Sequence, residues 1–198
     1  MIRKTRSVRT PVRREASERY ILLSLVSFAA SVVLTRTSLQ LTGYPQLGNS
    51  QLHIAHVLWG GLLLFIASLL PLILSNRWVF NLTAILSGVG VGLFIDEVGK
   101  FITQTNDYFF PPAAPIIYAF FLITVLLYLR VRRPPAVDPR AGLYRIFDDM
   151  SEVLDHNLAP EERADLAERL RAVATQPEQP DLAHLAQVLL EFLESDTV

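Results

Sequence analysis

Two histidines and two carboxylates, set in otherwise apolar sequence, are the residues of this chain best suited to chemistry. His53 and His56 are three residues apart, so on a helix they share one face. Asp96 and Glu97 are adjacent within the string Gly-Leu-Phe-Ile-Asp-Glu-Val-Gly-Lys-Phe, and Lys100 follows Asp96 by about one turn. Ionisable groups are costly in lipid, so they face the protein interior and mark candidate functional sites.

In the first of three interpretations, His53, His56 and Asp96 bind Zn²⁺ or a similar ion and leave one position open for water. Glu97 would then act as a general base in hydrolysis or group transfer. The His-x-x-His spacing lacks the glutamate of His-Glu-x-x-His and is therefore less diagnostic of zinc. Because adjacent residues diverge by ~100° around a helix, we expect only one of the two carboxylates to point at the histidines.

The second interpretation is structural: Arg36 and Lys100 neutralise Asp96 and Glu97 without a metal, in a hydrogen-bonded network that joins the helices. The third is a proton or ion pathway built from histidine and carboxylate groups, which in a chain with four spans would require an oligomer. Neither a substrate nor an enzymatic activity follows from the sequence, and whether the site takes a cofactor such as zinc stays open at this point.

The elements that must position these residues are membrane spans. The chain has 198 residues, of which 51% are hydrophobic and only 19% charged. Apolar segments predict an all-α membrane protein with four spans, at about 20–41, 52–74, 79–102 and 112–129. The apolar run of the first span is uninterrupted only from Tyr20 to Leu34, which is too short to cross a bilayer. We therefore expect this helix to continue through Arg36.

The second and third spans are joined by a turn at Ser75-Asn76-Arg77, which predicts an antiparallel hairpin. Counted from this turn, His56 and Asp96 lie at the same depth, roughly 26 Å along their helices. The same register places Gly60 opposite Gly92, and Leu64 opposite Gly88. Small residues allow close approach of two backbones, so we expect these glycines to form a tight seam between the two helices.

Basic residues predict the orientation in the membrane. Residues 1–19 carry seven basic and two acidic groups, and further arginines lie in the turn at Arg77 and at Arg130, Arg132 and Arg133. The positive-inside rule assigns all of these to the cytoplasm, so both termini would be cytoplasmic in a bacterial-type inner membrane. The basic N-terminus is suited to binding anionic lipid head groups. Tyr108, Phe109 and Phe110 resemble an interfacial aromatic belt.

Residues 134–198 form a separate acidic region. From 137 to 198 there are five arginines and fourteen carboxylates, a net charge of −9. Three amphipathic helices are predicted here, and their apolar positions are Leu143, Ile146/Phe147, Met150, Val153/Leu154; Leu166, Leu170, Val173; and Leu182, Leu185, Leu189, Phe192. We expect residues 142–195 to mediate self-association or to bind a protein partner. No nucleic-acid partner is expected, and the lack of cysteine excludes disulfides and thiolate metal sites.

Overall fold

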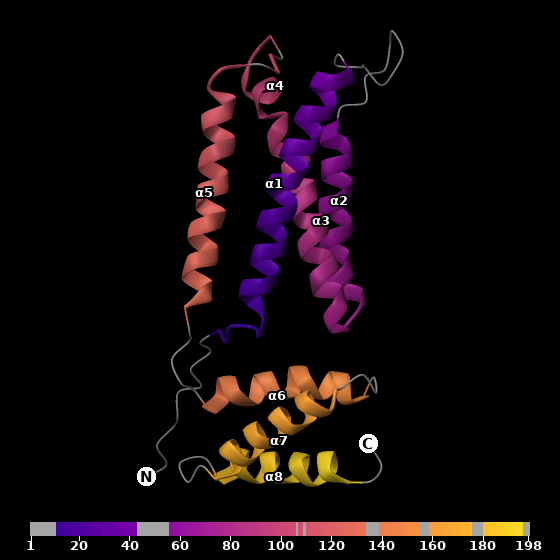
Figure 1. Ribbon diagram of the computed structural model, residues 1–198, viewed down its shortest axis with the longest axis vertical. Coiled ribbons are helices and arrows are strands. Elements are labelled where there is room, and N and C mark those ends of the chain that lie inside the picture. Colours follow the sequence, from indigo (N-terminus) through magenta and orange to yellow (C-terminus); the bar gives the residue numbers. More distant parts are fainter. Residues whose placement is uncertain are drawn as a thin grey trace, which may run out of the picture. The chain divides into compact units, whose positions relative to one another are not determined.

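The computed structural model of the chain describes residues 11–42, 56–105, 107–108, 110–133, 139–154, 159–175 and 180–195. These residues form eight helices and no strand, which confirms the predicted all-α class. In chain order the helices are α1 (Ser17–Thr42), α2 (His56–Ile73), α3 (Arg77–Asp96), α4 (Val98–Ile102), α5 (Ala113–Arg132), α6 (Pro139–Leu154), α7 (Pro160–Ala174) and α8 (Pro180–Glu194), as labelled in Figure 1.

The chain divides into two compact units. The membrane unit is Ala16–Pro134 and contains α1 to α5. The tail unit combines Met1–Glu15 with Pro135–Val198 and contains α6 to α8. The break between the units therefore falls at the Pro134-Pro135 pair and just before α1.

Four helices of the membrane unit, α1, α2, α3 and α5, are long and apolar enough to cross a membrane. They hold 26, 18, 20 and 20 residues. At 1.5 Å per residue the shortest extends about 27 Å, close to the ~30 Å hydrocarbon layer. Large apolar side chains cover their outer surfaces; Trp59, for example, is 54% exposed and Leu126 is 63% exposed. Helices suit this setting because they satisfy their backbone hydrogen bonds internally.

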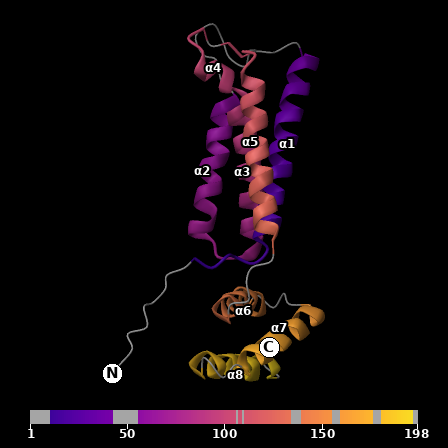
Figure 2. The same cartoon turned by 90° about the vertical axis from the view of Figure 1, so that its left-hand side faces the viewer.

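Helix α3 is the centre of the membrane unit. It packs against both α1 and α2, and α5 packs against α1 (Figures 1 and 2). The buried Phe28 of α1 connects the latter pair, because its ring contacts Phe120 and Phe121 of α5 with ring centroids 5.8 and 6.1 Å apart. Helix α2, which begins at His56, and helix α3, which ends at Asp96, are direct neighbours.

Glycines let α3 approach both neighbours closely, on two different faces. Gly60 of α2 lies against Gly90 and Phe94 of α3. Gly88 and Gly92 instead lie against α1, where added side chains would meet Ser24, Ser27, Phe28 and Ser31. The expected pairing of Gly88 and Gly92 with α2 is therefore wrong. Residues 88 and 92 occupy one face of α3, and residue 90, which is ~200° away from 88, occupies the face turned toward α2.

The α1–α3 seam also carries two hydrogen bonds. The hydroxyl of Ser24 donates to the carbonyl oxygen of Ala84 at 2.8 Å, and the hydroxyl of Ser31 donates to that of Val89 at 3.1 Å. The small serines of α1 thus permit the close approach of the two helices, and their hydroxyls donate hydrogen bonds to carbonyl groups of α3 that this approach brings within reach.

The third span is interrupted at Glu97, whereas the apolar pattern predicts one helix over 79–102. Helix α3 ends at Asp96 and the five-residue α4 begins at Val98. Glu97 has φ −87° and ψ 7°, and its N–H bonds to the carbonyl of Ile95. Gly99 then lies under the returning chain, since a Cβ there would stand 2.7 Å from the carbonyl oxygen of Asp107. Asp96 therefore ends α3, and Glu97 lies between α3 and α4.

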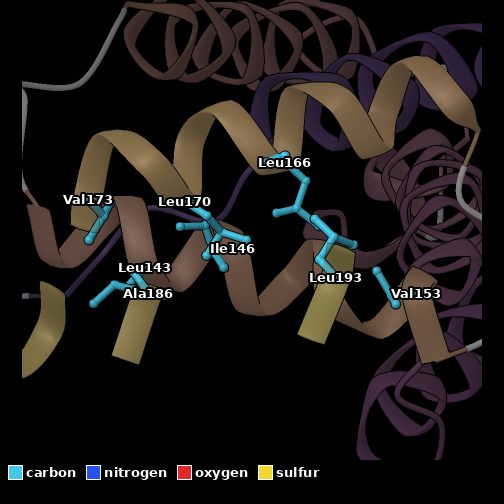
Figure 3. Close-up of a cluster of buried hydrophobic side chains, with 9 residues drawn as sticks. Leu143, Ile146, Val153, Leu166, Leu170, Val173, Ala186 and Leu193 are labelled. Carbon is cyan, nitrogen blue, oxygen red and sulfur yellow. The ribbon is translucent and has the colours of Figure 1, made fainter. Parts of the chain in front are cut away.

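The tail unit has its own apolar core, built by α6, α7 and α8. The labelled side chains of Figure 3 come from all three helices and are Leu143, Ile146, Val153, Leu166, Leu170, Val173, Ala186 and Leu193. Two aromatic side chains expected in this core are outside it: Phe147 is 51% exposed and Phe192 is 42% exposed. Their helical turns place Ile146 and Leu193, one residue before and after, toward the core instead.

An arginine links the helices of the tail unit to the residues before α1. Arg169 of α7 lies 3.2 Å from Glu15 and 3.2 Å from Asp149 of α6, and it also pairs with Asp165. Burial lowers the pKa of Arg169, but the hydrogen bond to Asp165 and the charges of Glu15 and Asp149 outweigh this effect and raise it. Glu15 is therefore bound electrostatically to the tail unit, to which it also belongs by its contacts.

Candidate functional site

The candidate site is a polar cluster of six residues, which are Arg36, His56, Asp96, Glu97, Lys100 and Tyr108. Arg36 projects from α1, His56 is the first residue of α2, and Asp96 is the last residue of α3. Glu97 lies at the break before α4, Lys100 lies in α4, and Tyr108 follows it. His53, the other predicted ligand, lies outside the described residues.

Asp96 is fully buried and both of its carboxylate oxygens are engaged. Nε of Arg36 lies 2.6 Å from Oδ1, and the hydroxyl of Tyr108 donates to Oδ2 at 2.5 Å. The guanidinium of Arg36 also lies 5.9 Å from the centre of the Tyr108 ring. A charge-assisted hydrogen bond and a phenolic one together replace the water that a carboxylate loses on burial.

Glu97 is also buried, with 1% of its surface exposed. Its Oε1 atom lies 2.9 Å from Nδ1 of His56 and 3.2 Å from Nζ of Lys100. Its Oε2 atom is buried and makes no hydrogen bond to any described residue. The negative charge of Glu97 is therefore balanced from one side, by a lysine one turn further along the chain.

His56 lies between the two carboxylates. Its Nε2 atom is 3.2 Å from Oδ2 of Asp96, and its Nδ1 atom is 2.9 Å from Oε1 of Glu97. The expectation that only one carboxylate can point at a histidine is therefore wrong. It assumed a continuous helix, but α3 ends at Asp96, and the two nitrogens of one imidazole lie on different edges of the ring.

The charges of the cluster balance without a metal ion. Arg36 and Lys100 supply two positive charges, and Asp96 and Glu97 supply two negative charges. A divalent cation would add two further positive charges in a low-dielectric region, and it would compete with Arg36 for an oxygen only 2.6 Å away. Among the described residues, no three or more His, Cys, Asp or Glu side chains are arranged to hold a metal. The zinc interpretation thus has no support from this part of the chain.

The predicted role of Glu97 as a general base fits its surroundings poorly. A general base must come within hydrogen-bond distance of a substrate proton. Glu97 is 1% exposed, and the oxygen that has partners already faces Lys100 and His56. The role of Glu97 as a general base therefore stays a prediction.

Tyr108 is the member of the cluster that the sequence did not single out. Its neighbours Phe109 and Phe110 suggested an interfacial role, which gave no reason to connect it with Asp96. Its position depends on the turn after α4, where Thr103 donates to the carbonyl of Gly99 at 2.7 Å and accepts from the N–H of Asp107 at 2.8 Å. Gly99 within a polar string was the available signal, because a glycine often marks close approach of another backbone.

The polar cluster therefore joins α1, α2, α3, α4 and the segment before α5 at one end of the membrane unit. Comparison with known proteins adds no function to this geometry: no family model, no curated protein and no solved structure matches the chain.

Proposed function

We propose that this protein is a non-enzymatic membrane scaffold. In this proposal four spans anchor it in a bacterial-type inner membrane, with both termini in the cytoplasm. The polar cluster holds the outer ends of the spans in a fixed arrangement, and the acidic tail unit binds a protein partner. The observation that carries the proposal is that both buried carboxylates of the cluster are already paired with cations of the same chain.

The pairing connects segments far apart in the sequence. The ion pair between Arg36 and Asp96 joins residues 60 positions apart, and His56 adds α2 to the same group. Removing one partner of a buried ion pair is strongly destabilising, because the other charge then remains buried and uncompensated. A network of this kind fixes which spans are neighbours and at what depth, which is what a scaffold requires.

The charge of the tail unit suggests the chemistry of its partner. Residues 137–198 carry a net charge of −9, and many of the acidic side chains are exposed, such as Glu161, Glu168 and Glu191. Charge complementarity steers association and rejects partners of like charge. We therefore expect a protein partner with a basic surface, and we expect the affinity to fall as salt is raised.

The experiment compares metal content and thermal stability of detergent-purified wild type, His56→Ala and Lys100→Ala. We expect no stoichiometric zinc in any of the three. Lys100→Ala should lower the free energy of unfolding by up to about 3 kcal/mol, because it leaves the buried Glu97 without its cation. The Lys100 side chain is 26% exposed, so water already weakens this ion pair and keeps the loss below that of a fully buried pair. His56→Ala should cost on the order of 1–3 kcal/mol, since it removes the imidazole that lies 2.9 Å from Glu97 and 3.2 Å from Asp96 and leaves no new charge.

Lys100→Arg is the matched control, because it keeps the positive charge and should retain most of the stability. The scaffold proposal fails if wild-type protein holds one zinc per chain and His56→Ala loses it. It also fails if Lys100→Ala is as stable as wild type, because Glu97 would then not depend on its pairing.

A further inference from the structure

The outward face of α6 carries two aromatic side chains that the tail-unit core does not use. Tyr144 is 54% exposed and Phe147 is 51% exposed. They are three residues apart, so they lie on one face of the helix. The apolar residues next to them, Leu143 and Ile146, are 5% and 0% exposed and belong to the core. Helix α6 is thus apolar on two faces, one turned to the core and one turned outward.

We propose that this outward face is a membrane-docking surface, with Tyr144 and Phe147 inserted among the lipid head groups of the bilayer that the spans cross. This inference deepens the proposed function. It rests on that proposal in one respect, which is that α6 lies on the cytoplasmic side of the membrane. Amphipathic helices bind bilayers by laying apolar side chains into the boundary between head groups and acyl chains. Tyrosine is enriched at this boundary, because its ring is apolar and its hydroxyl is polar.

The first argument for lipid as the occupant is the length of the connection. Residues 133–138, six residues, separate the last residue of α5 from the first residue of α6. Seven residue steps span at most about 25 Å even when fully extended. The end of α5 carries Arg130 and Arg132, as expected for the end of a span at a membrane surface. Helix α6 is therefore tethered within a short distance of that surface, at a high local lipid concentration.

The second argument is charge. Anionic head groups repel exposed carboxylates within about a Debye length, ~10 Å. Asp148, which follows Phe147 directly, lies 3.9 Å from Arg14. This pair reduces the negative charge beside Phe147, whereas Asp149 shares Arg169 with Glu15 and Asp165.

Helix α8 offers a comparison within the same unit. It also exposes apolar side chains, Val188 and Phe192, which are 48% and 42% exposed. Here, however, the exposed Glu191 precedes Phe192 directly, and Glu194, which pairs with Arg171, follows two residues later. This face combines apolar and acidic groups and is better suited to a basic protein than to an anionic bilayer.

The test uses full-length protein reconstituted into vesicles of phosphatidylcholine and phosphatidylglycerol. Trp59 and Trp78 are first replaced by phenylalanine, and one tryptophan is then introduced by Phe147→Trp or, as the matched control, by Phe192→Trp. Both substitutions replace a partly exposed phenylalanine, so neither is expected to disturb the core. Emission is recorded in ordinary vesicles and in vesicles whose acyl chains carry bromine, which quenches tryptophan on contact.

We expect the Phe147→Trp probe to emit at shorter wavelength than the Phe192→Trp probe and to lose much of its emission in brominated vesicles, while the Phe192→Trp probe keeps its emission. Equal emission of the Phe147→Trp probe in both kinds of vesicle overturns the proposal. An emission shift that depends on the protein-to-lipid ratio and persists in detergent also overturns it, in favour of a second copy as the occupant. Metal content and thermal stability report on the scaffold proposal separately, so failure of one proposal is distinguishable from failure of the other.

Discussion

Gly60 of α2 lies directly against Gly90 of α3: a Cβ on Gly60 would stand 2.8 Å from the carbonyl oxygen of Gly90, and a Cβ on Gly90 would stand 2.9 Å from that of Gly60. Both contacts are with backbone, which cannot move aside as a flexible side chain can. Gly61, the next residue, has nothing within 4 Å of the position that its Cβ would take. Two adjacent glycines therefore have opposite roles.

This difference predicts opposite effects of the same substitution. Gly60→Ala should lower the free energy of unfolding by about 1–3 kcal/mol, because an extra carbon at a close backbone crossing forces the helices apart. Gly61→Ala should be neutral or stabilising by up to about 1 kcal/mol, the gain in helix propensity over glycine. Unfolding of both variants in detergent checks the prediction, and equal stabilities would contradict a close α2–α3 crossing at Gly60.

A second substitution pair examines the seam between α1 and α3. A Cβ on Gly92 would stand 2.7 Å from the Cβ of Ser31, so Gly92→Ala should destabilise the protein by about 1–3 kcal/mol. Ser31→Gly by itself loses the hydrogen bond to Val89, but it should cost less in the Gly92→Ala background, because it removes the Ser31 atoms that the new Cβ would meet. The relief should be partial, since the carbonyl oxygen of Phe28 would stand 3.0 Å from that Cβ as well. Additive losses in the double variant would mean that the two residues do not contact each other.

Tyr108 should contribute to stability through its hydroxyl. Tyr108→Phe removes the hydrogen bond to Oδ2 of the buried Asp96 and leaves that oxygen with one fewer donor. We expect a loss of about 1–3 kcal/mol in the free energy of unfolding, as for other buried acceptors that lose a partner. Tyr118→Phe is the control, because Tyr118 is 62% exposed on α5. If the two variants unfold alike, the Tyr108 hydroxyl does not bind Asp96 in the protein.

Arg169 should stabilise the tail unit independently of pH in the neutral and alkaline range. Arg169→Gln removes contacts with Glu15, Asp149 and Asp165, and we expect a loss of about 1 kcal/mol for a partly exposed group with several ion pairs. The pKa of Arg169 is raised above its already strongly alkaline usual range, so its contribution is complete at neutral and moderately alkaline pH and is lost only when the pH rises past that range. The loss should therefore be the same at about pH 7 and pH 10.

Hydrogen exchange of the backbone amides of α6 and α7 measures this effect locally. Arg171→Gln is the control, because its partner Glu194 is 52% exposed and Arg171 itself is 57% exposed. Two results would contradict a stabilising role of Arg169. One is a larger loss of protection in Arg171→Gln than in Arg169→Gln, and the other is a loss in Arg169→Gln that disappears at pH 10.

The orientation of the spans follows from the basic residues alone and has its own test. Reporter fusions after Asn76 and after Pro134 should report the cytoplasm, and a fusion within 42–50 should report the exterior. An exterior signal after Pro134 would contradict an even number of spans before it.

The sequence by itself determined the properties that depend on one segment at a time. Apolar length indicates a span, because a helix must cover the hydrocarbon layer whatever its neighbours are. Counting along two helices from their shared turn brought His56 and Asp96 to the same depth, and the structure has these side chains 3.2 Å apart. Apolar periodicity likewise identified Leu143, Leu166 and Leu170, all of them in the core of the tail unit.

Only the tertiary structure decided which face of a helix meets which neighbour and where a helix stops. The glycines of α3 serve two neighbours, and composition does not tell which face meets α1 and which meets α2. The interruption at Glu97 depends on the chain that returns over Gly99 and brings Tyr108 to Asp96, a contact 12 residues away in sequence. The physical reason is common to both cases. Depth and amphipathicity are set by the residues of one helix, whereas packing partners and buried ion pairs depend on atoms from several segments, whose mutual positions no local pattern specifies.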